Sequence, residues 1–342
     1  MYYPNQLFLP MENHTTELVL STDPEPVVQV SPLSEPPYRK PFIEANTIES
    51  SLEEIRERHI IPVFIKDNEP LISHADFIKA TQEIAYELFP QEVISEPEVR
   101  VSHPVKGRIP EAKEKPAQFL EEWEKTLYYE RMAFILEIPT IQDTVDGNTL
   151  SLTIGGVKAY NLDNLYSRNQ SEQHFKVFIG FRNLVCTNLC ISTDGYQQQI
   201  TVKNLDQLRL FVRTLLGSYH AHRDLNFWKQ LSRYSISESQ FAHLVGRCRM
   251  YNHLPGKLKS EIPPLLFGDQ MINTVVRDFY RDNSFCRDDQ GNLNLWKLLN
   301  LFTGANKASY IDSFLDRTVN ANHLMHQLQT ALDHRESCWY LN

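Results

Sequence analysis

Hydrophobic and polar positions alternate most regularly between His174 and Ser192, in the sequence HFKVFIGFRNLVCTNLCIS. The alternation lasts for two strand lengths and breaks once, at the polar pair Arg182-Asn183. Alternation with a period of two is typical of half-buried strands. We therefore expect this stretch to form the centre of an antiparallel sheet.

Further strands are expected upstream and directly downstream of this stretch. Two hairpins are indicated by the turn pairs Asp146-Gly147 and Asp194-Gly195. The first has a somewhat extended turn, and Gly155-Gly156 is expected to end its second strand. The expected strands cover 61–66, 98–103, 127–138, 150–154 and 196–203, and a basic loop follows 98–103.

The hydrophobic period changes from 2 to 3.6 residues after position 203. From there, five helices are expected to begin at Asn204, Ser237, Asp269, Asn294 and Ser309, residue types that favour helix starts. Two earlier helices begin after Ser51 and Ser73. Strands followed by helices indicate an α+β fold, in which an antiparallel sheet built from hairpins precedes a mostly helical C-terminal third.

The same patterns predict three regions. Residues 1–45 form a disordered Pro-rich tail, because eight of the 19 prolines lie within residues 1–42 and no apolar stripe repeats there. Residues 46–203 form a mixed region that contains the sheet. Residues 204–342 form a helical region packed on or beside it. The tail is a candidate binding site for a protein partner, and the folded part is a candidate homo-oligomer.

Composition and short motifs limit the cellular location and the cofactors that are expected. No apolar run approaches the length of a spanning helix, and the first 20 residues lack the basic segment of a secretion signal. Five scattered cysteines do not form a disulfide framework. A cytoplasmic protein without a membrane span is expected. Neither a Walker-type nor a GxGxxG glycine pattern occurs, so NTP hydrolysis is disfavoured, and no cofactor is predicted.

Much of the chain, from about Val99 onward, resembles an uncharacterised protein family of conjugative and other mobile elements in gut anaerobes. The resemblance is carried by the stretches RVSHPVKGRIPEAKEKPAQFLEEWEKTLYYERMAF, HFKVFIGFRNLVCTNLC, FAHLVGRCRMYNHLP and LFTGANKASYIDSFLDRTVNA, among others. More distantly, Cys186-Thr187-Asn188 and the helix end from Trp296 to Thr303 are similar to a broader phage- and plasmid-associated family. The resemblance implies a mobile-element setting and supplies no catalytic residues.

The charge distribution leaves room for a local basic surface. Residues 1–58 contain ten acidic and four basic residues and so carry −6 of the net charge of −9. Basic residues could converge around the sheet, with Tyr128, Tyr129, Phe175 and Phe181 among them, as in grooves where bases stack and phosphates are neutralised. The candidate nucleic-acid-binding residues are His103, Lys106, Arg108, Lys158, Arg182, Lys203 and Arg213, with Arg209 beside them.

A metal site has weaker support. Cys186 and Cys190 share one face of a strand, and His220 and His222 follow, but zinc ligands usually sit on tight knuckles or one helix turn. Buried thiols are the better interpretation, and no metal is predicted.

Three functions remain open. The first is a non-enzymatic accessory protein that binds single-stranded nucleic acid through a basic face of the sheet. The second is a nucleic-acid-processing enzyme, with His103, Asp146, Asp194 or the acids between Asp278 and Asp289 as candidate groups. The third is a protein-interaction module. Convergence of three or more carboxyl or imidazole groups would favour the second, and a large exposed apolar patch would favour the third.

Overall fold

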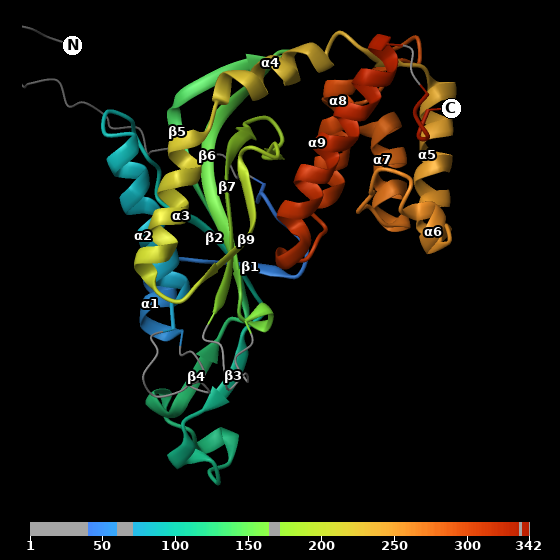
Figure 1. Ribbon diagram of the computed structural model, residues 1–342. Helices are drawn as coiled ribbons and strands as arrows, with labels where there is room; N and C mark the ends of the chain where they lie inside the picture. Colours follow the sequence, from blue (N-terminus) through green and yellow to red (C-terminus); the bar gives the residue numbers. More distant parts are fainter. Residues whose placement is uncertain (1–39, 60–70, 164–171, 335–336, 342) are drawn as a thin grey trace, which may run out of the picture. The chain divides into compact units, whose positions relative to one another are not determined.

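The computed structural model describes residues 40–59, 71–163, 172–334 and 337–341. Its main sheet is antiparallel, with the strand order β1-β2-β5-β6-β7-β8, and β9 also pairs with β7 (Figure 1). The strands are β1 (Thr47–Ser50), β2 (Glu98–Ser102), β5 (Arg131–Val145), β6 (Asn148–Ala159), β7 (Gln173–Asn183), β8 (Leu189–Cys190) and β9 (Tyr196–Val202).

The stretch with the strongest alternation is central, as predicted. β7 pairs with β6 on one side and with β8 and β9 on the other. The strand ends at Asn183, where the polar pair interrupts the alternation, and the chain turns back through Thr187 at a φ of 62°. Asp194-Gly195 then leads into β9, but β8 and β9 both pair with β7 and not with each other, and the Gly195 carbonyl accepts from the Ile179 amide of β7 at 2.8 Å. The expected hairpin turn at Asp194-Gly195 is therefore wrong, because the chain continues there along the edge of β7.

In the first hairpin, the strands are longer and the turn is shorter than the sequence indicates. Its turn is the two-residue Asp146-Gly147, with φ values of 48° and 76°, as in a type I′ turn. β6 also continues through Gly155-Gly156 instead of ending there. A Cβ atom at Gly155 would lie 2.2 Å from the backbone oxygen of Phe134, so this glycine permits close approach of two strands.

Helices α1 (Leu52–Arg58), α2 (His74–Leu88) and α3 (Leu205–Ser218) pack on one face of the sheet (Figure 1). Their starts follow the predicted caps: Ser73 and Asp76 form a capping box, and Asn204 accepts from the Gln207 amide. Phe77 of α2 packs edge-on against Phe134 and Phe175 of the sheet. The predicted strand at 61–66 lies outside the described residues.

The other face of the sheet packs against α9 (Ile311–His334). Phe42 and Ile43 are buried between the sheet and this helix, with Phe314 6.1 Å from Phe42 between ring centroids. The expected boundary of the tail at residue 45 therefore falls inside the packed structure, because these two apolar side chains complete the second core.

The C-terminal third is helical, as predicted. It contains α4 (Ala221–Leu231), α5 (Glu238–His253), α6 (Gly256–Lys259), α7 (Asp269–Arg281), α8 (Leu295–Asn306) and α9, with the short strands β10 (Ser235–Ile236) and β11 (Leu293–Asn294). Its apolar side chains join the same hydrophobic cluster as the sheet, for example Trp228 against Phe181. Among the described residues, no helix has the length and apolarity needed to cross a bilayer.

Candidate functional site

The predicted basic residues do not gather on one exposed face. Lys158 is fully buried at the end of β6, where its ammonium group pairs with Asp163. Burial lowers the pKa of Lys158 to about 8, although the Asp163 carboxylate acts in the opposite direction. In this position Lys158 cannot reach a phosphate in solvent, so it is not part of an open groove.

Arg182 is also buried, with 3% of its surface exposed. Its Nη1 lies 2.8 Å from Glu98 and 3.4 Å from Glu137. A buried guanidinium needs such partners because it has lost its hydration. The partners are carboxylates of β2 and β5, strands that do not pair with β7, and Asp146 and Asp194 lie in other turns, where they contact Asn294 and Arg223.

The basic residues of α3 face α2. Arg209 pairs with Glu83 at 2.7 Å, and Arg213 pairs with Glu87. Both arginines thus hold two helices together with their charge already balanced. Lys203 is exposed just before α3 and forms no ion pair within the described segments, whereas the exposed Arg213 has its charge balanced by Glu87.

His103, Lys106 and Arg108 lie on an arm that we define as residues 103–128. The expected basic loop is in fact strand β3 (Val105–Arg108), because its backbone pairs with β4 (Lys125–Tyr128), a later segment that the folded chain brings alongside it. Trp123 and Phe119 of the arm are 71% and 61% exposed. By contrast, Tyr129, Phe175 and Phe181 belong to the core. The arm therefore combines exposed lysine with exposed aromatic rings.

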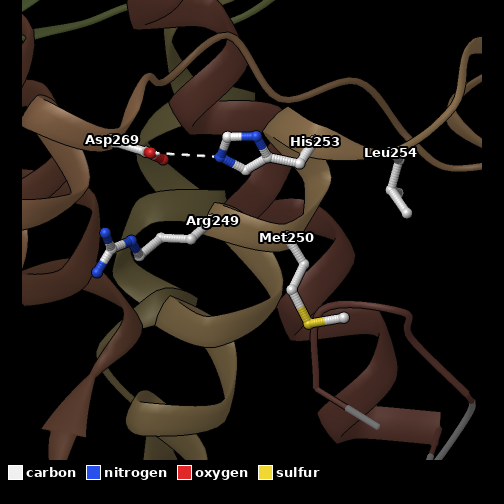
Figure 2. Close-up of a pocket in the computed structure, with 5 residues that line it drawn as sticks. All are labelled: Arg249, Met250, His253, Leu254 and Asp269. Carbon is white, nitrogen blue, oxygen red and sulfur yellow. Dashed lines mark ion pairs between the residues drawn. The ribbon is translucent and has the colours of Figure 1, made fainter.

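A second basic surface lies on α5 and α6 and was not predicted. Residues 239–260 contain four Lys or Arg, two His and no Asp or Glu. The exposed side of α5 borders a cavity of about 450 Å³ lined by Arg249, Met250, His253, Leu254 and Asp269 (Figure 2). The sequence signal was the absence of acids in RCRMYNHLPGKLK, which a search for basic residues around the sheet does not detect.

Asp269 is the acidic group of this cavity. It accepts a hydrogen bond from Asn252 Nδ2 at 3.1 Å and lies 3.5 Å from His253 Nε2. The Asn252 hydrogen bond is the main cause of its lowered pKa, to which His253 and Arg249 also contribute. Arg249 is exposed and forms no ion pair within the described part of the chain. The cavity thus offers a free guanidinium beside Met250, which is 55% exposed.

The cysteines have the character of packed thiols. Cys190 is buried and Cys186 is half-buried. Burial raises the pKa of Cys186 to about 11 and that of Cys190 well above its ordinary value. Across residues 40–59, 71–163, 172–334 and 337–341, no three His, Cys, Asp or Glu side chains gather as a ligand set for a metal ion.

The turn at 186–188 and the helical segment 296–303 contact each other. Asn188, in the turn between β7 and β8, donates from Nδ2 to the carbonyl oxygen of Asn300 on α8 at 2.9 Å. Asn183 donates to the Asn300 side chain at 3.1 Å. All three asparagines are buried, so this contact fixes the turn to the helix.

A family model matches residues 25–341 of the chain. It is described as "Domain of unknown function, B. Theta Gene description (DUF3871)". No curated protein and no solved structure matches the chain significantly.

Proposed function

The chain belongs to the domain-of-unknown-function family DUF3871, and we propose that it is a mobile-element accessory protein that binds single-stranded nucleic acid in the cytoplasm. The mobile-element setting rests on the resemblance of stretches such as HFKVFIGFRNLVCTNLC to a protein family of mobile elements in gut anaerobes. Binding is assigned to the acid-free segment 239–260, with the arm as a second contact.

The observation that carries this proposal is the charge of segment 239–260. Neutralisation of phosphates dominates the affinity of proteins for nucleic acids, so an interface needs cations whose charge is not already balanced in an ion pair. Here four Lys or Arg occur without an Asp or Glu in a chain whose net charge is −9. Arg249 and Lys257 are exposed and have no ion-pair partner in the described segments, so their charge is available.

The sheet itself is less suited to this role than the sequence indicates. Lys158, Arg182 and Arg213 all pair with carboxylates. Binding through α5 and α6 does not require these pairs to break. The exposed Trp123 and Phe119 of the arm can stack on unpaired bases, which favours single strands over duplexes.

Fluorescence anisotropy with a labelled single-stranded oligonucleotide tests the proposal. The variant Arg249→Ala/Lys257→Ala is compared with Arg209→Ala/Arg213→Ala, which also removes two positive charges but takes them from the α2–α3 ion pairs. We expect the first variant to bind more weakly and to lower the slope of log K against log salt by about 1.4, or 0.7 for each lost contact. The second should retain the wild-type slope.

Three outcomes would count against the proposal. Absence of binding by the wild-type protein at low salt would remove nucleic acid as a ligand and favour the enzyme or interaction-module alternatives. An equal loss of oligonucleotide affinity in the two variants would indicate that only the total charge of the protein matters. If only Arg209→Ala/Arg213→Ala binds the oligonucleotide more weakly, the interface would lie at the sheet and α3 and not at α5 and α6.

A further inference from the structure

One carboxylate lies among the five residues that line the cavity beside α5 (Figure 2). Arg249, Met250, His253 and Leu254 come from one side of α5 and its end, since residues four apart on a helix are neighbours. Asp269, the first residue of α7, completes the lining. The volume of about 450 Å³ is within the range of small-molecule sites and exceeds that of a single nucleobase.

The carboxylate of Asp269 is held in a fixed position. Asn252 of α5 donates from Nδ2 to Asp269 Oδ1 at 3.1 Å and to the carbonyl oxygen of Phe267 at 3.2 Å. This one amide therefore ties the start of α7 to α5. The pKa of Asp269 is lowered, chiefly by the Asn252 hydrogen bond, so the group is ionised at neutral pH. Its side chain remains 38% exposed, so a guest in the cavity can reach it.

Both oxygens of Asp269 can accept further hydrogen bonds. An ionised carboxylate has about four lone-pair positions, and Asn252 uses one of them. His253 Nε2 lies 3.5 Å from Asp269 Oδ2, longer than an ordinary N–H···O hydrogen bond (Figure 2). The His253 side chain is 76% exposed and can move aside. The cavity therefore presents two oxygens that suit a guest with two adjacent donors.

Among the nucleobases, guanine has this pair of donors. Its N1–H and N2–H groups lie side by side on the Watson–Crick edge, which is unpaired and accessible in a single strand. Adenine and cytosine place their amino group beside a ring nitrogen whose lone pair would repel a carboxylate. Thymine and uracil have one N–H between two carbonyl groups. A fixed carboxylate therefore selects guanine.

The rest of the cavity suits a base that is part of a strand. Met250 is 55% exposed and offers a thioether to the face of an aromatic ring, with Leu254 beside it. Arg249 is exposed and can neutralise the adjoining phosphate. Asp269 itself repels phosphates, so its place in a basic surface is unfavourable for backbone binding alone. Recognition of a base edge gives the carboxylate a role there.

We propose that the cavity beside α5 is a guanine-binding subsite of the single-strand surface. Guanine N1–H and N2–H donate to the two oxygens of Asp269, the ring contacts Met250, and the neighbouring phosphate pairs with Arg249. This inference rests on the proposed function and adds a base preference to it.

Fluorescence anisotropy with thymine oligonucleotides of about ten nucleotides, a length that one single-strand-binding domain can cover, tests the subsite. The central base is guanine, adenine or hypoxanthine, which keeps N1–H and lacks the N2 amino group. We expect guanine to bind at least about fivefold more tightly than adenine, as for other bidentate contacts, with hypoxanthine between them.

Asp269→Asn should abolish the preference for guanine, because it replaces one acceptor oxygen by an N–H donor and keeps the shape of the side chain. Glu53→Gln is the matched control: it also removes a negative charge, from an exposed position on α1, and should keep the preference.

The outcomes separate the subsite from the surface. Equal affinity of the wild-type protein for the three oligonucleotides would overturn the guanine subsite and leave the proposed surface in place. A preference for guanine that persists in Asp269→Asn would also overturn it, since another group would then read the base. Absence of binding to all three oligonucleotides at low salt would overturn the surface and the subsite together.

Discussion

Asn188 and Asn300 join the turn between β7 and β8 to helix α8 through a hydrogen bond of 2.9 Å. Asn300 is 1% exposed, and its side chain also accepts from Asn183 at 3.1 Å and donates to the carbonyl of Trp296 at 2.9 Å. One buried amide thus serves the strand and its own helix. When the Asn300 side chain is removed, the Asn183 amide loses its acceptor and the Trp296 carbonyl loses a donor.

We expect Asn300→Ala to lower the free energy of unfolding by about 2–3 kcal/mol. The change leaves the buried amide of Asn183 without its acceptor, which costs more than the hydrogen bond contributed. Urea denaturation measures the loss. Asn273→Ala is the control, since Asn273 is exposed on α7 and should change stability by less than about 0.5 kcal/mol. Equal effects of the two changes would contradict a structural role for Asn300.

Arg182→Met is expected to be more costly, at about 3–5 kcal/mol. The side chain of Glu137 is 8% exposed and would keep a buried charge without the Arg182 guanidinium. The double variant Arg182→Met/Glu137→Gln should regain part of the stability because it removes that charge as well. Thermal unfolding compares both with Arg209→Ala, whose exposed pair should cost less than about 1 kcal/mol. No recovery in the double variant would exclude charge burial as the cause.

Acid should destabilise the protein through His59 and His74. In the unfolded chain, imidazoles take up protons near pH 6.5, whereas folded His59 does so only at a pKa of about 4. The unfolded state therefore binds more protons in this window, and the free energy of unfolding falls as the pH drops from 6.5 to 4. For His59 we expect about 1–2 kcal/mol, since the ring is partly exposed.

Thermal unfolding at a series of pH values checks this dependence. His59→Phe keeps an aromatic ring and removes the titrating group, so its melting temperature should depend less on pH between 6.5 and 4 than that of the wild-type protein. His253→Gln removes an exposed imidazole and should retain the wild-type dependence. Identical profiles for the wild type and His59→Phe would contradict a neutral, half-buried His59 in the folded protein.

Local features of the fold could be predicted from the sequence. Helix caps such as Ser73 with Asp76 and Ser237 with Gln240 act within three residues, and the structure contains both. Helix α4 was missed because its first residues contain no side-chain cap. The role of Gly156 could not be predicted, since its constraint comes from Phe77, 79 positions away, whose ring would lie 2.5 Å from an added Cβ.

The ion pairs of the candidate basic residues were harder to predict, because their partners are brought together only by the folded sheet. Lys158 and Arg182 are basic residues on strands, and only the paired register of β5, β6 and β7 brings Asp163 and Glu137 against them. Spacing along the chain does not report such partners. The segment 239–260 was detectable in principle, because a lack of acids is a property of the sequence alone.

The arm provides a test of base stacking that is separate from the phosphate contacts. Of the four tryptophans, Trp228 and Trp296 are fully buried, whereas Trp123 is 71% exposed. A base that stacks on Trp123 should therefore quench a large part of the exposed tryptophan fluorescence. It should add about 1–3 kcal/mol to binding, as measured for other aromatic platforms.

We expect single-stranded oligonucleotide to quench the fluorescence of the wild-type protein and to have much less effect on Trp123→Leu, which should bind about tenfold or more weakly. Lys106→Ala should weaken binding and keep the quenching, because it removes a phosphate contact and leaves the ring in place. Duplex DNA of the same sequence is the control, since its bases are already stacked on one another. Quenching by duplex as strong as by single strand, or undiminished quenching in Trp123→Leu, would exclude the arm from base recognition and leave α5 and α6 as the whole interface.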